Sequence, residues 1–523
     1  MNSPASAGNR FGLLALTVFG GATLALAQSP APPSADSLDA AKQIIAMERD
    51  HSDVMDNLEY LSDQIGPRLT GSARLYQANQ WTMAKMKAYG LENVHLEPYT
   101  IPCGWERRKV EAKIIAPNTF DVIAAQYAWT PGTHGKITGN VIIFAPTTEA
   151  DFAAYKGKLK GAIVLTSPLP TPEKPGPAPA LPDGKALPVI PAFPPAAPAS
   201  ADPVPAPRVS GREDEDANQP PPPDRAKAIA FRAKVREFMK QEGVAVTLID
   251  AGKPHALLNM TGSWTNIPPY TPLFVAHEQI ALIQRYLSHN LPVKMEIQAG
   301  GRIINKPITV YNTVGEIRGS EKPNEIVLIG GHLDSWDLGQ GSTDNGTGAM
   351  AVLEAARDLA TLNVHPKRTI RFVLFSGEEE GLHGSEAYVK AHKAEMPNVD
   401  VVFIHDTGTG RVKGAWLQNR VEDKPMLTAQ FALLQAAGLM TDAPNLLPGK
   451  MNGTDHASFD DAGVPAFAFN QESIEYGLTH HSQSDTFDKA RPDDLKQGAC
   501  VLALFALTAA QSTETYPRAP AKP

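Results

Sequence analysis

Cysteine is scarce in this sequence, which has only Cys103 and Cys500 among its 523 residues. So few cysteines exclude a scaffold held together by disulfides, although these two could pair in an oxidising compartment. After residue 27, no stretch approaches the run of about 18 apolar residues that a membrane-spanning helix requires. Basic residues are outnumbered by acidic ones, 48 to 56. The net charge of -8 therefore argues against nucleic acid as a partner and against a basic membrane-binding patch.

The N-terminal 27 residues are typical of a signal peptide. Arg10 supplies a positive charge, residues 11–26 are mostly apolar, and Ala25-Leu26-Ala27 matches a small-residue cleavage site. We therefore expect an exported protein, periplasmic or secreted, whose mature chain begins at Gln28. A disordered N-terminal extension is the alternative interpretation.

Proline marks a boundary within the chain, whose length predicts two or three domains. Residues 168–223 hold 19 of the 46 prolines and predict a disordered surface loop, because they offer little apolar surface to bury. This loop interrupts residues 120–268, where short strands and an amphipathic helix at 228–239 predict a smaller, β-rich α+β insert domain. The remaining predicted parts are a leader with the first part of a catalytic domain at 28–119, its main part at 269–515 and a tail at 516–523.

Strands and helices alternate through the second half of the chain. Residues 326–329, for example, are an aliphatic run between a charged segment and two glycines, which is typical of a buried parallel strand. The predicted strands are 310–314, 326–329, 370–375, 401–404 and 466–469, and the predicted helices are 349–362, 385–393, 425–439 and 495–510. This alternation predicts an α/β fold with a mostly parallel sheet that helices cover on both faces.

Four of these strands lead into imidazole or carboxylate side chains. In chain order, these are His332, Asp334, Asp337 and Asp344; then Glu378, Glu379 and Glu380; then His405 and Asp406; then His480 and His481. Taken singly, such residues are more often solvated or helix-capping than ligating. The carboxyl ends of parallel strands meet at one edge of a sheet, however, so we expect these groups to converge.

The converging set has the composition of a two-metal hydrolase. Such a site needs one shared carboxylate, terminal nitrogen and oxygen ligands, and a free carboxylate that takes a proton from water. Imidazole and carboxylate together favour zinc. The candidate ligands are His332, Asp344, Glu379, Asp406 and His481, which leaves Glu378 as the candidate general base.

Five motifs carry a resemblance to a known family. GGHLDSWD, STDNGTGA, FSGEEEGLHGS, HDTG and HHSQSDTFD resemble, in this order and spacing, the co-catalytic di-zinc exopeptidases of the aminopeptidase Y and carboxypeptidase Q type. The segments LDSWDLGQG and PKRTIRFVLF are most similar to carboxypeptidase Q. The resemblance is strong over residues 310–509 and weak over 120–268, where this family often carries a protease-associated insert domain.

The resemblance implies a division of the ligands between two zinc ions. Asp344 would bridge the ions, His332 and Asp406 would complete one site, and Glu379 and His481 would complete the other. His481 is favoured over its neighbour because only His481 places the following Asp-Thr pair in the register of the family pattern.

The resemblance also implies roles outside the ligand set. Glu378 would be the general base, and the carboxylate of Asp334 would orient His332. Glu380 stands where relatives carry an apolar or amide residue, so we expect it to be solvated. Asp455 and His456 match a family loop that we expect to be structural.

The implied activity is hydrolysis of terminal peptide bonds of small peptides, as in a carboxypeptidase Q-like dipeptidase. An aminopeptidase of the same family is the alternative. A mono-zinc glutaminyl cyclase and a non-catalytic, receptor-like relative share the fold and are weaker alternatives. A homodimer is suggested by the resemblance alone.

Overall fold

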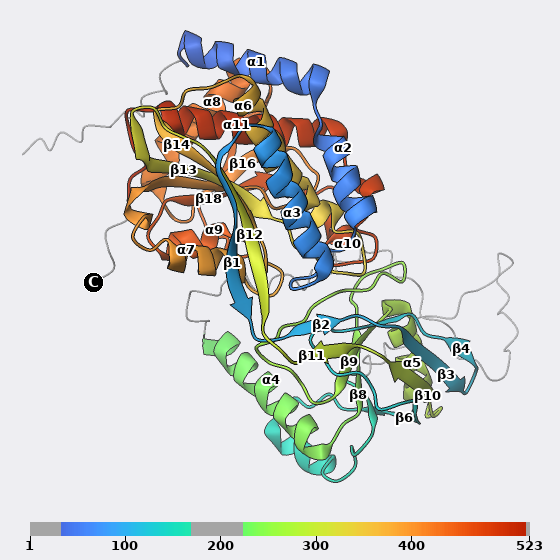
Figure 1. Ribbon diagram of the computed structural model, residues 1–523. Helices are drawn as coiled ribbons and strands as arrows, with labels where there is room; N and C mark the ends of the chain where they lie inside the picture. The colour runs from blue at the N-terminus through green and yellow to red at the C-terminus, as the bar shows by residue number, and fades with distance from the viewer. Residues whose placement is uncertain (1–32, 169–222, 519–523) are drawn as a thin grey trace, which may run out of the picture.

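The computed structural model describes residues 33–168 and 223–518, and its centre is an eight-stranded sheet (Figure 1). In spatial order its strands are β1 (Glu92–Ile101), β12 (Ile308–Ile317), β14 (Arg368–Phe375), β13 (Lys322–His332), β15 (Val399–Ile404), β18 (Ala466–Gln471), β16 (Val412–Trp416) and β17 (Asn445–Leu447). The four central strands, β14, β13, β15 and β18, pair in parallel. The contacts of β12 with β1 and β14, and of β16 with β18, are antiparallel. The predicted α/β class is confirmed, with the parallel pairing concentrated at the centre of the sheet.

Helices cover both faces of this sheet. One face carries α1 (Ala35–His51), α2 (Val54–Glu59), α3 (Ala73–Ala88), α6 (Thr347–Thr361), α8 (Lys424–Ala436) and α11 (Pro492–Gln511), and the other carries α7 (His383–Ala391) and α9 (His456–Asp461). Along β14, Ile370, Phe372 and Leu374 pack into the first core, whereas Val373 and Phe375 pack into the second. Because alternate side chains enter apolar cores on both faces, residues 372–375 of β14 and 326–329 of β13 are uninterrupted apolar runs.

A second eight-stranded sheet forms the smaller part of the molecule, in the lower half of Figure 1. In spatial order its strands are β4 (Phe120–Asp121), β3 (Val110–Ala116), β10 (Lys294–Ala299), β6 (Ile137–Ile143), β7 (Ile163–Leu165), β8 (Val246–Asp250), β9 (Thr271–Val275) and β5 (Ala124–Gln126). It is accompanied by α4 (Pro223–Glu242) and α5 (His277–Ser288). The two sheets are joined by a ribbon of β2 (Gly104–Glu106) and β11 (Arg302–Ile304). The second sheet is thus inserted between β1 and β12, which are hydrogen-bonded neighbours in the first.

The second sheet extends past the predicted insert limits of 120–268 on both sides. β3 lies before these limits, and all of β9, α5 and β10 lie after them, in the range expected for the main catalytic domain. β10 joins the second sheet by pairing with β3 and β6, and β9 joins it by pairing with β8 and β5. The division of the chain into domains remains a prediction.

An apolar cluster joins the two parts of the molecule. Trp129, from the second part, lies 5.0 Å from Trp264 and 6.4 Å from Trp336 between ring centroids, and Trp336 follows β13 of the first sheet. Beside this cluster, Arg107 Nε lies 2.8 Å from Asp337 Oδ1, with both side chains largely buried. The two parts therefore share a packed interface as well as the connecting ribbon.

Some predictions concern single residues or the chain ends. Cys500 is buried in the core of the first sheet and Cys103 in the cluster between the two parts, and both thiols are free. Within residues 33–168 and 223–518, no helix is long and apolar enough to cross a membrane. The predicted signal peptide lies outside the described residues, as does the predicted loop 168–223 apart from its first and last residues.

Helix α1 is attached to α6 through a buried group of carboxyls. Glu48 of α1 meets Glu354 and Asp358 of α6, and at most 2% of each residue is exposed. Arg357 is the nearest cation, with its Nη2 atom 2.6 Å from Glu354 Oε1 and 3.3 Å from Asp358 Oδ1. Burial raises the pKa of Glu48 to about 9 and the pKa values of Glu354 and Asp358 to about 7. The folded chain therefore holds protons here that the unfolded chain releases at lower pH.

This proton uptake predicts a pH-dependent stability. The contribution of the group is complete below the ordinary carboxyl pKa of about 4 and is lost as the pH rises through 7 toward 9. In Glu48→Gln, one buried charge cannot form, so we expect a free energy of unfolding about 1–3 kcal/mol higher than wild type at pH near 9, and little gain near pH 5. Urea denaturation at the two pH values measures this difference. Asp39→Asn, on an exposed part of α1, is the control and should change neither value, whereas equal effects of Glu48→Gln at both pH values would contradict the prediction.

Candidate metal centre

The carboxyl ends of the four central strands meet at one edge of the first sheet. β13 ends at His332, and β14 ends just before the turn that carries Glu378 and Glu379. β15 ends two residues before Asp406, and β18 leads through the short helix α10 (Tyr476–Thr479) to His481. The structure therefore brings together the groups that follow these four strands.

Asp344 lies at the middle of this group. It belongs to the tight turn 342–346 that precedes α6, and only 4% of it is exposed. Its Oδ1 atom lies 3.5 Å from His332 Nε2, and its Oδ2 atom lies 3.5 Å from His481 Nε2. The two oxygens of one carboxylate thus face two different imidazoles.

Each imidazole meets a further carboxylate. His332 Nε2 lies 3.1 Å from Asp406 Oδ1, and His481 Nε2 lies 3.0 Å from Glu379 Oε2. His332 Nε2 is therefore approached by Asp344, Asp406 and, at 3.8 Å, Glu378 Oε2, although one ring nitrogen can share at most one hydrogen with them. Asp344 Oδ2 is buried and accepts no hydrogen bond. Several carboxylates around one nitrogen, with a buried oxygen left without a donor, form an arrangement that fits a cation.

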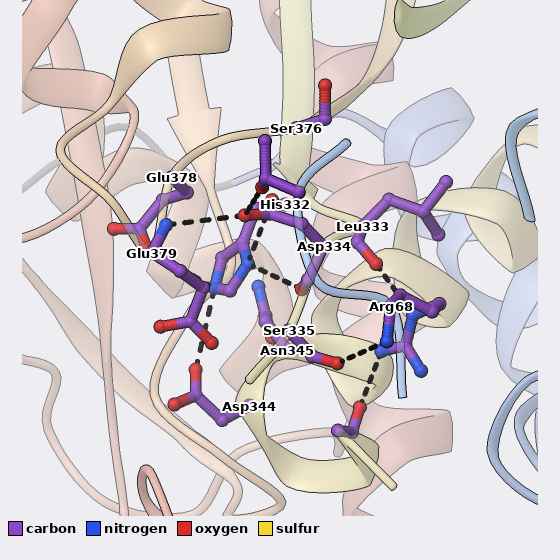
Figure 2. A network of polar contacts seen from close by, with 12 residues as sticks. Arg68, His332, Leu333, Asp334, Ser335, Asp344, Asn345, Ser376, Glu378 and Glu379 are labelled. Carbon is purple, nitrogen blue, oxygen red and sulfur yellow. Dashed lines mark hydrogen bonds and ion pairs between the residues drawn. The ribbon is translucent and has the colours of Figure 1, made fainter. Parts of the chain in front are cut away.

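His332 is held in one orientation from its other side. Its Nδ1 atom lies 3.1 Å from the main-chain oxygen of Asp334 and 3.6 Å from Asp334 Oδ1 (Figure 2). The nearer partner is thus the carbonyl of Asp334 rather than its carboxylate. Asp334 Oδ2 instead accepts hydrogen bonds from Thr70 Oγ1, at 2.9 Å, and from the main-chain N–H of Glu379, at 3.3 Å. Asp334 therefore joins the loop after β13 to the turn after β14.

The charges at this edge of the sheet are strongly unbalanced. Burial raises the pKa of Glu378 and that of Glu379 well above the ordinary range, and it raises the pKa of Asp406 as well. Burial also raises the pKa of Asp344, but the hydrogen bond to His332 and the two histidines at 480 and 481 outweigh burial and lower it overall. A bound cation would offset this crowding of buried negative charge.

Glu380 is buried, so the prediction that it would be solvated is wrong. Only 8% of it is exposed, and burial together with the nearby charge of Asp334 raises its pKa well above the ordinary range. The turn after β14 closes through hydrogen bonds from Gly381 N to Glu378 O and from His383 N to Gly377 O, both of 2.8 Å. This tight turn keeps all three consecutive carboxylates near the centre.

Several neighbours of the centre were assigned no role from the sequence, or only a structural one. Asp485 accepts hydrogen bonds from the main-chain N–H groups of Thr343, at 2.6 Å, and Asp344, at 3.1 Å, and so holds the turn that carries Asp344. His480 stacks on His481 with ring centroids 3.7 Å apart. Asp455 is fully buried, and burial raises its pKa to about 7. The sequence offered only one signal for Asp485, its place in the register of the last motif.

Arg68 supports the loop that joins β13 to this turn. It is fully buried, and its guanidinium donates to the main-chain oxygens of Leu333, at 2.7 Å, and Gly341, at 2.7 Å. It also donates to the oxygens of Gly66, at 3.1 Å, and Gln340, at 2.9 Å. Figure 2 shows it beside the loop, on the side away from Glu379. The planar guanidinium thus binds three carbonyls from the two ends of residues 333–341 and one from Gly66, which fixes the path of that loop.

A comparison with family models identifies the part of the chain that carries this centre. Residues 312–506 match the model described as "Peptidase family M28". The matched region contains all five candidate ligands and Glu378, and it is similar to the peptidases of this family. The predicted class of enzyme, a metallopeptidase that acts as an exopeptidase, is thereby confirmed at the level of the family.

Relatives of known name resemble the chain over most of its length. It is 27% identical to carboxypeptidase Q of Rattus norvegicus over 471 residues, which cover 88% of this chain and 86% of that protein. It is 28% identical to carboxypeptidase Q of Xenopus laevis over 469 residues, which cover 88% of this chain and 87% of that protein. The resemblance thus extends beyond the matched family region to the second sheet.

Solved structures show the same architecture. A peptidase M28 precursor from Shewanella amazonensis superposes with a TM-score of 0.71 at 25% identity, covering 93% of this chain and 99% of that one. BSAP, a zinc aminopeptidase from Bacillus subtilis, superposes with a TM-score of 0.60 at 18% identity, covering 88% of this chain and 95% of that one. At that identity the second likeness concerns the fold alone.

The position of Arg68 predicts the effect of a conservative replacement. A lysine keeps the positive charge but carries its donors on one nitrogen, so Arg68→Lys should leave buried carbonyls without partners. We expect a free energy of unfolding lower by about 2–4 kcal/mol, measured by urea denaturation. Arg74→Lys is the matched control, because Arg74 is exposed and donates to the main-chain oxygen of Ile65. Equal stability of the two variants would contradict the role given to Arg68.

Proposed function

We propose that the protein is an exported, zinc-dependent exopeptidase that hydrolyses terminal peptide bonds of small peptides, as a carboxypeptidase Q-like dipeptidase. The observation that carries this proposal is the shared position of Asp344, whose two oxygens each lie 3.5 Å from a different imidazole nitrogen. A carboxylate in this position suits a pair of metal ions about 3.5–4 Å apart.

In this proposal Asp344 would contribute to both zinc sites, His332 and Asp406 would hold one ion, and Glu379 and His481 would hold the other. Two ligand atoms that each lie about 2.1 Å from a tetrahedral zinc ion are about 3.4 Å from one another. The facing nitrogen and oxygen atoms of these groups lie 3.0–3.5 Å apart, which supports the assignment. The mixture of imidazole and carboxylate also suits zinc, the metal in the name of the aminopeptidase from Bacillus subtilis.

Glu378 has the proposed role of general base. When bound, the two ions would lower the pKa of a water molecule and polarise the scissile carbonyl. Glu378 Oε2 lies 3.8 Å from His332 Nε2, so this carboxylate faces the centre but lies beyond hydrogen-bond distance of the ring nitrogen. Burial raises its pKa well above the ordinary range, which suits a carboxylate that takes a proton from water and passes it to the leaving amine. Asp334 would keep His332 in register through its main-chain oxygen.

The substrate assignment rests on the relatives. The chain resembles carboxypeptidase Q over 88% of its length, and its second sheet lies within the resemblance, which supports activity on unblocked small peptides. An aminopeptidase activity is the second candidate, because aminopeptidases share the fold. A glutaminyl cyclase or a receptor-like protein is disfavoured because the five proposed ligands and Glu378 lie together.

Export rests on the sequence of residues 1–27, and a homodimer rests on the family resemblance. Both belong to the proposal. Neither property is supported by the geometry of the metal centre.

Replacing the proposed base tests the mechanism. Glu378→Gln preserves the shape of the side chain but cannot take up a proton, so we expect turnover to fall by at least ~10²–10⁴-fold. Elemental analysis should still find two zinc ions per chain, because Glu378 is not among the proposed ligands. Glu386→Gln is the control. Glu386 is a mostly exposed carboxylate on α7, so its replacement should leave turnover and zinc content unchanged. Near-normal turnover by Glu378→Gln would remove Glu378 from this role.

A substrate panel tests the proposed activity. Free dipeptides should be cleaved, and the same dipeptides with a blocked carboxyl terminus should be poor substrates. Chromogenic amides with a free amino terminus should be cleaved slowly. Efficient cleavage of those amides would favour the aminopeptidase, and a purified chain with neither zinc nor peptidase activity would overturn the proposal as a whole.

A further inference from the structure

A loop of the second part of the molecule reaches the segment that carries His481. Residues 251–270 connect β8 to β9, and the first part of this connection, 251–259, lies against residues 476–486 of the first part of the molecule. Lys253 Nζ donates to the main-chain oxygens of Gly477, at 2.7 Å, and His480, at 2.8 Å. The contact therefore links the second sheet directly to one end of the metal centre.

A second pair of hydrogen bonds fixes the same contact. The main-chain N–H of Leu258 donates to Gln483 Oε1 at 2.8 Å, and Gln483 Nε2 donates to the main-chain oxygen of Ala256 at 3.2 Å. The two loops are thus held at two points, one on each side of His481 in the sequence.

Lys253 is buried, with 6% of the residue exposed. Burying an ammonium group costs several kcal/mol unless its hydrogens find acceptors. A buried lysine therefore needs acceptors that are held in place. Its partners are carbonyls at the end of α10, a helix of four residues whose last carbonyls lack partners within the helix. The ammonium and these carbonyls therefore satisfy each other.

The backbone at His481 needs such support. His481 has a φ of 53°, in the left-handed region that residues other than glycine rarely adopt. The oxygen of His480 that Lys253 holds belongs to the peptide group joining His480 to His481. Fixing this peptide plane sets the direction from which the His481 ring meets Asp344 and Glu379.

The His332 side of the centre is held by the first sheet itself. His332 is the last residue of β13, and Asp406 follows the end of β15 by two residues. These two strands pair in the middle of the first sheet. His332 is further held by the main-chain oxygen of Asp334. Its position is therefore set within the first part of the molecule.

We propose that Lys253 is a positioning residue that holds the His480–His481 peptide and thereby determines the metal affinity of the site formed by Asp344, Glu379 and His481, leaving the site with His332 and Asp406 unchanged. The inference rests on the proposed function. It makes the second part of the molecule a structural component of one of the two metal sites.

Competition with a chelator tests this assignment. The full chain, loaded with zinc, is challenged with increasing concentrations of a chromogenic chelator, and the release of each ion is followed by absorbance. In Lys253→Met, one ion should be released at a chelator strength about 10–100-fold lower than in wild type, the usual effect of losing a group that orients a metal ligand. The second ion should be released as in wild type. Lys253→Arg should restore most of the affinity, because a guanidinium can donate to both carbonyls.

Controls separate this role from a general effect on folding. Lys136→Met removes a lysine of the second part that is more than half exposed, and it should release both ions as wild type does. If Lys253→Met does not fold, Gln483→Leu, which removes the other pair of contacts, should show the same selective loss. Unchanged release of both ions, or equal weakening of both in a folded variant, would overturn the proposal. A wild-type chain with fewer than two bound zinc ions would instead count against the proposed function, whatever the variants do.

Discussion

The structure depends on the placement of one buried carboxylate, that of Asp344, between two imidazoles. Burying it among other acidic groups is costly unless positive charge compensates it, so its position must be enforced by the surrounding chain. The enforcement is visible in the contacts of its turn. Asp485 accepts hydrogen bonds from the main-chain N–H groups of Thr343 and Asp344, and α6 begins directly after the turn. Hydrogen bonds within the fold thus hold Asp344 close to other buried carboxylates, although the negative charges of these groups repel one another.

The central strands and the groups at their ends could be predicted from the sequence for a simple reason. A strand such as β14 that is apolar on both faces can lie only in the middle of a covered sheet, and parallel neighbours end at the same edge. Hence the sequence alone predicts that the same groups meet, namely His332, Asp344, Glu379, Asp406 and His481. Their distances could not be predicted, and their roles as ligands remain a proposal.

Features that depend on long-range pairing could not be predicted in this way. β10 follows β9 and α5 in a regular alternation of strand and helix that continues into the first sheet, and only its pairing with β3 and β6 shows where it belongs. The burial of Glu380 could not be predicted, because burial in a tight turn depends on how the turn closes, which residue types alone do not reveal. The role of Arg68 could not be predicted either, since its partners are main-chain oxygens up to 273 residues away.

The ribbon of β2 and β11 has a mechanical consequence. The chain enters and leaves the second part of the molecule through two short strands bonded to each other, so that part is mounted on a single narrow stem. A body on such a stem is easily twisted unless other contacts hold it. The Arg107–Asp337 ion pair, the tryptophan cluster and the hydrogen bonds of Lys253 and Gln483 are such contacts. If the stem twisted, the residues of this part that lie beside the metal centre, such as those of loop 251–259, would move together. The rigidity of a few residues remote from the chemistry thus limits how accurately the reacting groups are aligned.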